Sequence, residues 1–319
     1  MDDILFSLNI ILPLVLLVMI GYTLRKTSLL SPEFYPSAEK LVFKIALPCS
    51  LFTSIYNADP SGAFNPKLIV FCTVGIAVTF LVPCFIVPVF LKDNQKRGAF
   101  IQGVYRSNFA ILGLPIAERL FGATGTVVAT SLMPFSIPLF NIFAVIILSI
   151  FAPSDKKMTK SQIAVRSVKG IVTNPLIIGI ALALPFMITG IRLPEMAVST
   201  IGYLGKLTTP LALICLGASM SGTKSKSSSI VLASIAAVIK IVVIPAALVI
   251  AAILFGFRGV ELGTIFILFG GPTAVSSYIM AKNMKSDHAL AGQILILTTV
   301  LCSVTVFVAI FLLKHFSLI

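Results

Sequence analysis

The stretch SNFAILGLPIAERLFG, from Ser107 to Gly122, lies inside an apolar run but carries an asparagine and a Gly-Leu-Pro triplet. Proline lacks an N–H group and clashes with the carbonyl one turn back, while glycine adds backbone freedom. In hydrocarbon each backbone group that loses its partner costs several kcal/mol. Such a break persists only where it is buried in protein or lines a wet cavity. The stretch therefore predicts a broken membrane helix whose break has a function.

The composition is that of an all-α polytopic membrane protein. The 319 residues are 58% hydrophobic and 11% charged, whereas an average soluble domain is about 25% charged. A span needs about 20 mostly apolar residues, and ten such runs follow one another with short connections. The first run is interpreted as a span, because acidic residues precede it and no signal-peptide cleavage site follows. The spans are expected at 4–24, 37–57, 67–91, 98–120, 123–151, 162–188, 197–220, 229–256, 259–283 and 287–313.

The net charge of +13 is distributed as a topology signal. Fifteen Lys and Arg residues fall in connections after odd-numbered spans, against five after even-numbered spans and in the tail. Because cytoplasmic loops carry the excess of Lys and Arg, both termini are predicted outside the cytoplasm, in a cell (inner) membrane. No nucleic-acid partner is needed to explain the charge. The fifteen are Arg25, Lys26, Lys40, Lys92, Lys96, Arg97, Lys156, Lys157, Lys160, Arg166, Lys169, Lys224, Lys226, Lys282 and Lys285.

The two halves of the chain share a register of special residues. A shift of 162 overlays Pro13, Lys44, Pro48 and Pro83 on Pro175, Lys206, Pro210 and Pro245, and a shift of 157 overlays Gly113, Pro115 and Ala117 on Gly270, Pro272 and Ala274. This predicts two five-helix repeats, 1–153 and 162–319. Five spans is an odd number, so the second copy enters the membrane from the opposite side. Inverted repeats of this kind are typical of secondary transporters.

The predicted breaks in spans 4 and 9 would cross near the middle of the membrane. Each half-helix N-terminus offers about half a positive charge and free N–H donors, which suits a carboxylate. Asn141 has a second interpretation, a hydrogen bond between helices. The candidate substrate-binding residues are Asn108, Gly113, Leu114, Pro115, Asn141, Gly270, Gly271, Pro272, Thr273, Ser276 and Ser277.

Three stretches resemble one family. NFAILGLPIAERLFG resembles the fourth-span motif of the auxin efflux carrier family, in which an Asn stands five residues before Gly-x-Pro, and LVFKIALPCSLFTSI and GGPTAVSSYIMAKNM are similar to the family's second and ninth spans. The resemblance covers the whole chain. It implies a scaffold of spans 1, 2, 6 and 7 that forms a homodimer, and a moving transport unit of spans 3–5 and 8–10. It also implies that Asn108 contacts the substrate beside Pro115 and Pro272.

The resemblance further implies a small organic anion as substrate, such as a malate-, malonate- or auxin-like acid. Two departures matter. Plant members have Gln where this chain has Thr273, and a long loop where it has APSDKKMTKS at 152–161. Both indicate a prokaryotic carrier with a substrate other than auxin.

Other polar residues inside the runs have two interpretations each. Lys44 is expected to reach the cytoplasmic face, whereas Lys206 and Lys240 lie deeper, and Lys240 either attracts substrate or bonds a freed carbonyl. Arg106 is a candidate guard of the cytoplasmic mouth. Asn174 is expected to bond between helices.

No deep carboxylate pair is found, because Glu118, Glu261, Asp287, His288 and His315 all lie near span ends. A proton relay is therefore not supported. Na⁺ coupling stays open, since unwound carbonyls and hydroxyls can bind that ion.

The predicted function is a carrier of small organic anions that works by alternating access. A Na⁺-coupled symporter of the bile-acid-carrier type and an anion channel are the alternatives. An enzyme is not expected: the chain has no HExxH, GxGxxG or Walker A pattern. Its five cysteines lie in apolar runs without CxxC spacing, which predicts no metal site.

Overall fold

The computed structural model describes the chain except for residues 1, 58–64, 154–164, 166–167 and 222–226. The predicted boundary between the repeats, and Lys156, Lys157, Lys160, Arg166, Lys224 and Lys226, lie outside the described residues, as does most of the 152–161 connection.

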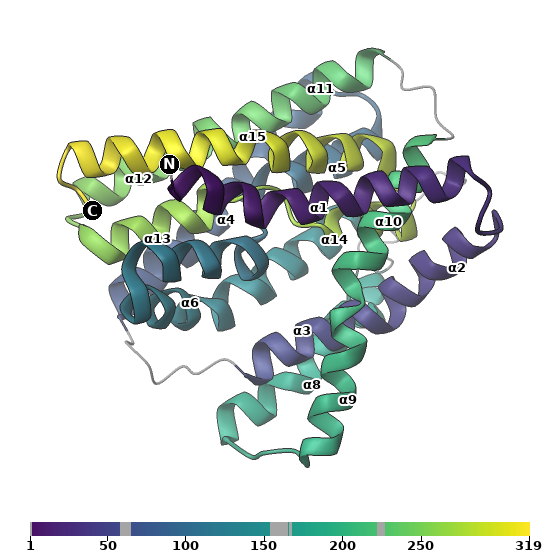
Figure 1. Ribbon diagram of the computed structural model, residues 1–319, viewed down its shortest axis with the longest axis horizontal. Helices are drawn as coiled ribbons and strands as arrows, with labels where there is room; N and C mark the ends of the chain where they lie inside the picture. The colour runs from purple at the N-terminus through teal and green to yellow at the C-terminus, as the bar shows by residue number, and fades with distance from the viewer. Residues whose placement is uncertain (1, 58–64, 154–164, 166–167, 222–226) are drawn as a thin grey trace.

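Throughout the described part every element is a helix (Figure 1). The elements are α1 (Asp2–Lys26), α2 (Phe34–Leu41), η1 (Val42–Ala46), α3 (Leu47–Tyr56), α4 (Pro66–Phe90), α5 (Asn94–Tyr105), η2 (Phe109–Gly113), α6 (Leu114–Ile150), α8 (Pro175–Thr189), α9 (Glu195–Lys206), α10 (Thr208–Ser221), α11 (Ser227–Val238), η3 (Ile239–Val243), α12 (Ile244–Leu254), α13 (Gly259–Gly270), α14 (Ser276–Asn283) and α15 (His288–His315).

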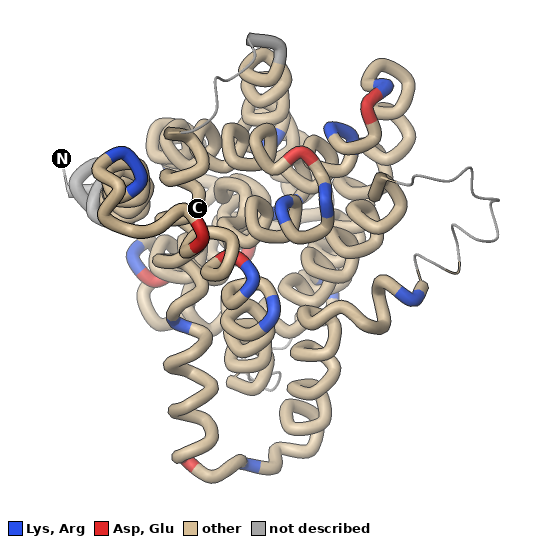
Figure 2. Tube along the Cα trace, turned by 90° about the vertical axis from the view of Figure 1, so that its right-hand side faces the viewer, with Lys and Arg blue, Asp and Glu red and all other residues tan. Residues whose placement is uncertain are grey.

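Many helices are long and apolar enough to cross a membrane. Five stretches meet that description by length and composition, namely Pro66–Phe90, Asn94–Ile150, Glu195–Ser221, Ser229–Leu254 and His288–His315. Large apolar side chains face outward on them; Val89 is 81% and Leu254 82% exposed. Charged residues occupy few positions along the trace (Figure 2). An apolar exterior of this extent is stable in lipid rather than in water.

Asparagine and aspartate side chains begin four helices. Asn65, Asp93, Asn174 and Asp287 accept hydrogen bonds from the first turns of α4, α5, α8 and α15, which satisfies donors that lack an intrahelical acceptor. Asn174 Oδ1 accepts from Leu176 N at 3.0 Å. The side chain also makes the expected bond between helices, since Asn174 Nδ2 donates to Met284 Sδ, at the end of α14, at 3.9 Å.

Three π-helical segments precede prolines. η1, η2 and η3 end two residues before Pro48, Pro115 and Pro245. Proline cannot donate to the carbonyl four residues earlier, and a wider turn accommodates the missing bond without leaving the helix.

This arrangement corrects the expected position of the first break. Gly113 has helical dihedral angles, φ −69° and ψ −44°, so the chain does not leave the helix at Gly113–Pro115. The helix is instead interrupted after α5, where Arg106 is extended (φ −70°, ψ 141°) and Asn108 is non-helical. The π segment absorbs the effect of Pro115. The second break lies where it was expected, since Pro272 falls between α13 and α14.

Glycines set two details of the chain path. Gly122 (φ 61°) turns the chain inside α6, between the positions expected for spans 4 and 5. Gly21 of α1 lies against the Ile214 backbone of α10, and Gly217 of α10 lies against the Val18 backbone of α1. These contacts bring the two helices close together.

In Figure 1, α3, α8 and α9 extend away from the other helices.

Candidate functional site

The two helix breaks lie against each other and are joined by hydrogen bonds, and this contact between the breaks is called the crossing below. Asn108 N donates to Pro272 O at 2.8 Å. Thr273 Oγ1 donates to Gly103 O at 2.6 Å, and Gln102 Nε2 donates to Ser277 O at 2.9 Å. Each break therefore supplies partners for groups that the other leaves free, as buried backbone requires.

A cavity of about 100 Å³ lies beside this crossing. Residues 106–111 and 274–276 line it from the two breaks, Asn141 lines it from α6, and residues of α3 and the start of α10 complete it. Ser50 and Ser54 of α3 and Thr208 and Thr209 of α10 give that wall hydroxyl groups. The cavity thus combines polar groups with an apolar lining and is formed by segments far apart in the sequence.

Two helix N-termini face the cavity. η2 begins at Phe109 and α14 at Ser276, and the residues that begin both helices are among the lining residues. Neither helix has a side-chain cap. The first N–H groups of a helix have no acceptor within it and carry partial positive charge. At α14 the N–H groups of Ser277 and Tyr278 already donate to Ala274 O and Val275 O, so that helix end favours an anion in the cavity through its partial positive charge.

Arg106 adds a full positive charge. Its side chain is 2% exposed, and its Nη2 donates to Asn141 Oδ1 at 2.9 Å and to Ser276 Oγ at 2.7 Å. In the described part of the chain no carboxylate oxygen lies within 4.0 Å of it. A buried charge without a counter-charge is costly, which makes the cavity beside it a place for an anion.

Several polar atoms at the cavity have no protein partner. Arg106 Nε, Ser107 Oγ and Thr208 Oγ1 are buried and make no hydrogen bond with described residues. The Asn108 side chain lines the cavity and has no hydrogen bond to the described chain. Buried polar groups are nearly always paired, so these atoms are available to a ligand.

The structure places the eleven sequence-predicted residues in three groups. Asn108, Asn141 and Ser276 line the cavity. Pro272 and Thr273 hold the crossing, and Gly271 allows close approach, since an added Cβ would lie 2.8 Å from Ser107 Oγ. The others do not line the cavity. Gly113, Leu114 and Pro115 lie beyond the first turn after the first break and Gly270 lies before the second, whereas Ser277 is in the first turn of α14 but is not among the lining residues.

Sequence reasoning undervalued Arg106 and did not select the hydroxyl residues of α3 and α10. The signal for Arg106 was a lone arginine in an apolar run next to a break. It also missed Glu39, which is buried and accepts a hydrogen bond from Tyr278 Oη at 2.8 Å. Nothing in the local sequence marks Glu39, because its burial depends on α14.

The lysines within the apolar runs differ in how far their side chains are buried. Lys44 and Lys206 are exposed on the outside of the helices, and Lys206 lies in the middle of the apolar stretch Glu195–Ser221. Lys240 is fully buried, and its Nζ donates to Phe269 O at 2.6 Å. This is the predicted bond to a freed carbonyl.

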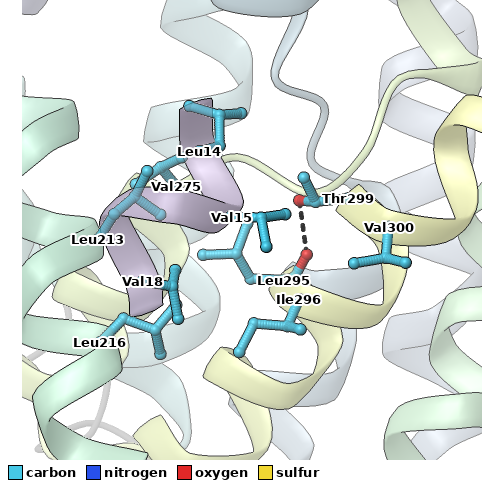
Figure 3. A pocket seen from close by; sticks show the side chains of 10 residues that line it. All are labelled: Leu14, Val15, Val18, Leu213, Leu216, Val275, Leu295, Ile296, Thr299 and Val300. Carbon is cyan, nitrogen blue, oxygen red and sulfur yellow. Dashed lines mark hydrogen bonds between the residues drawn. The ribbon is translucent and has the colours of Figure 1, made fainter. Parts of the chain in front are cut away.

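Two other cavities are apolar. One of about 50 Å³ lies between α1, α10 and α15 (Figure 3). The Thr299 hydroxyl there donates to Leu295 O within its own helix at 2.7 Å (Figure 3). The other, about 430 Å³, lies between η3–α12, α13 and α15 and has an almost wholly aliphatic lining. Neither offers charge to an anion.

Comparison with known proteins agrees with a membrane transporter. A family model described as "Membrane transport protein" matches residues 6–310. The chain is 22% identical to an uncharacterized transporter of Methanothermobacter thermautotrophicus over 94% of this chain and 96% of that protein. It is 24% identical to one of Methanocaldococcus jannaschii over 92% and 94%. It is also similar to the uncharacterized transporter YfdV of Escherichia coli strain K12, at 23% identity over 88% and 89%.

These matches cover nearly the whole chain, in keeping with its apolar helices. The chain is an integral membrane protein and a transporter rather than an enzyme, and it belongs to the membrane transport protein family, the auxin efflux carrier family that its broken-helix motif resembles.

Proposed function

We propose that this transporter moves a small organic carboxylate by alternating access and holds the carboxylate in the cavity beside the helix crossing. One observation carries the proposal: a buried arginine, Arg106, lies between two helix N-termini and has no carboxylate partner among the described residues. The substrate itself would supply the missing negative charge.

The donors at the cavity suit a carboxylate. Arg106 Nε and Ser107 Oγ have no protein partner, and the Asn108 amide supplies further donors. Hydrogen bonds to a charged group contribute about 1.5–3 kcal/mol each. A carboxylate could accept from several of these donors at once, whereas a cation would meet only positive charge.

The position of the cavity supports alternating access. Helices α3 and α10 form one wall, and α6, α14 and the break after α5 form the other. In the proposed ten-span architecture these walls belong to the scaffold and to the transport unit. Relative movement of the two units would then open the cavity to either side of the membrane.

Helix pairing supports the proposed inverted repeat. The first predicted span, α1, packs along α10, and the corresponding helix of the second repeat, α8, packs along α3. Exchange of partners between corresponding helices is expected of two related halves. The homodimer and the placement of both termini outside the cytoplasm belong to the same proposal and rest on the family resemblance and the charge distribution.

The test is ligand-induced stabilisation of the purified protein. Cys72, Cys215 and Cys302 are free and buried, so a thiol-reactive dye reports unfolding of a chain that has no tryptophan. Mono- and dicarboxylates are compared with their uncharged amides, in Na⁺ and in choline buffer. A ligand at 100 times its Kd stabilises by about 2.7 kcal/mol.

We expect an acid to raise the melting temperature and its uncharged amide to leave it unchanged. A rise that needs Na⁺ would indicate a symporter. No rise with any acid would refute the anion site. In liposomes, saturable uptake with countertransport would mark a carrier, whereas large unitary currents would mark a channel.

A further inference from the structure

A second buried cation, Lys240, lies at the break between α13 and α14 and does not line the cavity of the proposed anion site. Lys240 is in η3 and is 0% exposed. Its ammonium donates to Phe269 O at 2.6 Å. Within the described residues no carboxylate oxygen lies within 4.0 Å of it. Only an environment of negative charge stabilises a bare ammonium in such a place.

The end of α13 supplies that negative charge. Phe269 O would normally accept from Thr273 N, but the break diverts that N–H to Thr298 Oγ1 at 3.2 Å. The next carbonyl, Gly270 O, faces the Cys302 thiol at 3.7 Å, a weak donor. The end of a helix carries about half a negative charge on such carbonyls. The break thus leaves the carbonyl oxygens of Phe269 and Gly270 without a backbone N–H donor from the described residues.

In secondary transporters, unwound carbonyls and the C-terminal ends of half-helices are the groups that coordinate a transported cation. We propose that this structure has a cation site of that kind at the end of α13, and that the chain fills it permanently with the ammonium group of Lys240. Because the site is filled from within, no Na⁺ is needed there for transport.

Lys240 is then a positioning residue for the anion site, an inference that rests on the proposed function. Its partner, Phe269, is three residues before Pro272, whose carbonyl accepts from Asn108 N. By holding the end of α13, the ammonium fixes the crossing on which the cavity is built. Removing the charge should loosen the break and weaken anion binding without touching the anion.

Two variants separate charge from hydrogen bonding. Lys240→Ala removes both and leaves room for a small amine. Lys240→Gln keeps a donor but has no charge. Lys206→Ala is the matched control, because that lysine is exposed. Melting temperatures of the full chain are measured in Na⁺, K⁺, choline and ethylammonium chloride at constant ionic strength, without any carboxylate.

We expect the wild type and Lys206→Ala to melt alike in all four salts. Both Lys240 variants should melt at lower temperatures. Ethylammonium should raise the melting temperature of Lys240→Ala above its value in choline, and should not do so for Lys240→Gln. Carboxylate affinity of Lys240→Ala should fall about tenfold, as expected when a buried charged donor is lost, and should recover in ethylammonium.

Three results would overturn the inference: stabilisation of the wild type by Na⁺ over choline, wild-type melting of Lys240→Gln, or no selective effect of ethylammonium on Lys240→Ala. If Lys240→Ala does not fold, the melting of the wild type in Na⁺ and choline and the melting of Lys240→Gln still test the inference. The cation response is measured without carboxylate, so it stands or falls separately from the proposed function. Rescue by ethylammonium in a protein that binds no acid would refute the anion site and keep the cation site.

Discussion

Arg106→Gln tests the anion site most directly. Glutamine removes the positive charge but keeps an amide that can donate to Asn141 Oδ1, the acceptor 2.9 Å from Nη2 in the wild type. The change therefore separates the charge of the residue from its hydrogen bonding inside the cavity.

The magnitude follows from the contacts. A carboxylate in the cavity would lose charge-assisted hydrogen bonds to the guanidinium, worth about 1.5–3 kcal/mol, which corresponds to a Kd about 10- to 150-fold higher. The free energy of unfolding of the unliganded protein should rise or stay unchanged. A buried charge that lacks a counter-charge costs several kcal/mol, and the lost bonds to Asn141 and Ser276 offset part of the gain.

The assay combines calorimetric titration of the best acid with melting curves in its absence. Lys96→Gln, in the helix α5 that ends directly before Arg106 but outside the cavity, is the control and should keep the wild-type Kd. We expect Arg106→Gln to lose affinity while its unliganded melting temperature stays equal or rises. Wild-type affinity, or a large loss of unliganded stability, would show that Arg106 is a structural residue and would refute the reasoning.

Three further substitutions have expected outcomes. Asn108→Ala should keep the fold and raise the Kd about tenfold or more, since one hydrogen bond to a charged group is lost; an unchanged Kd in titration would remove Asn108 from the site. Thr273→Val should lower the free energy of unfolding by about 1–3 kcal/mol, because a buried carbonyl at the crossing loses its donor; an unaltered denaturation midpoint would contradict this. Gly21→Ala should sharply lower the melting temperature, because a Cβ there would overlap the Ile214 backbone, whereas Gly202→Ala, where a Cβ meets nothing within 4 Å, should be neutral.

Much of the site was predictable because it depends on backbone chemistry. Asn108 and Pro272 were selected from their motifs, and both lie at the crossing. Gly113 and Pro115 were selected for the same reason, and the structure keeps both within a helix. Proline demands a local adjustment, but whether the chain breaks or forms a π turn depends on the partners that neighbouring helices offer.

The sequence by itself determined that this is an all-helical membrane protein of a transporter family, because apolar runs, their lengths and the Gly-x-Pro motifs are local properties. It also marked Lys240 as a deep residue that either attracts substrate or bonds a freed carbonyl. Only the tertiary structure decided which charges are buried. Arg106 and Lys240 lie inside while Lys44 and Lys206 face outward, since burial is set by helices that are distant in sequence. The same packing places Arg106 between two helix N-termini and Lys240 at a helix C-terminus. Because the surroundings of both residues have low polarity, their electrostatic interactions with the helix ends are stronger than they would be in water.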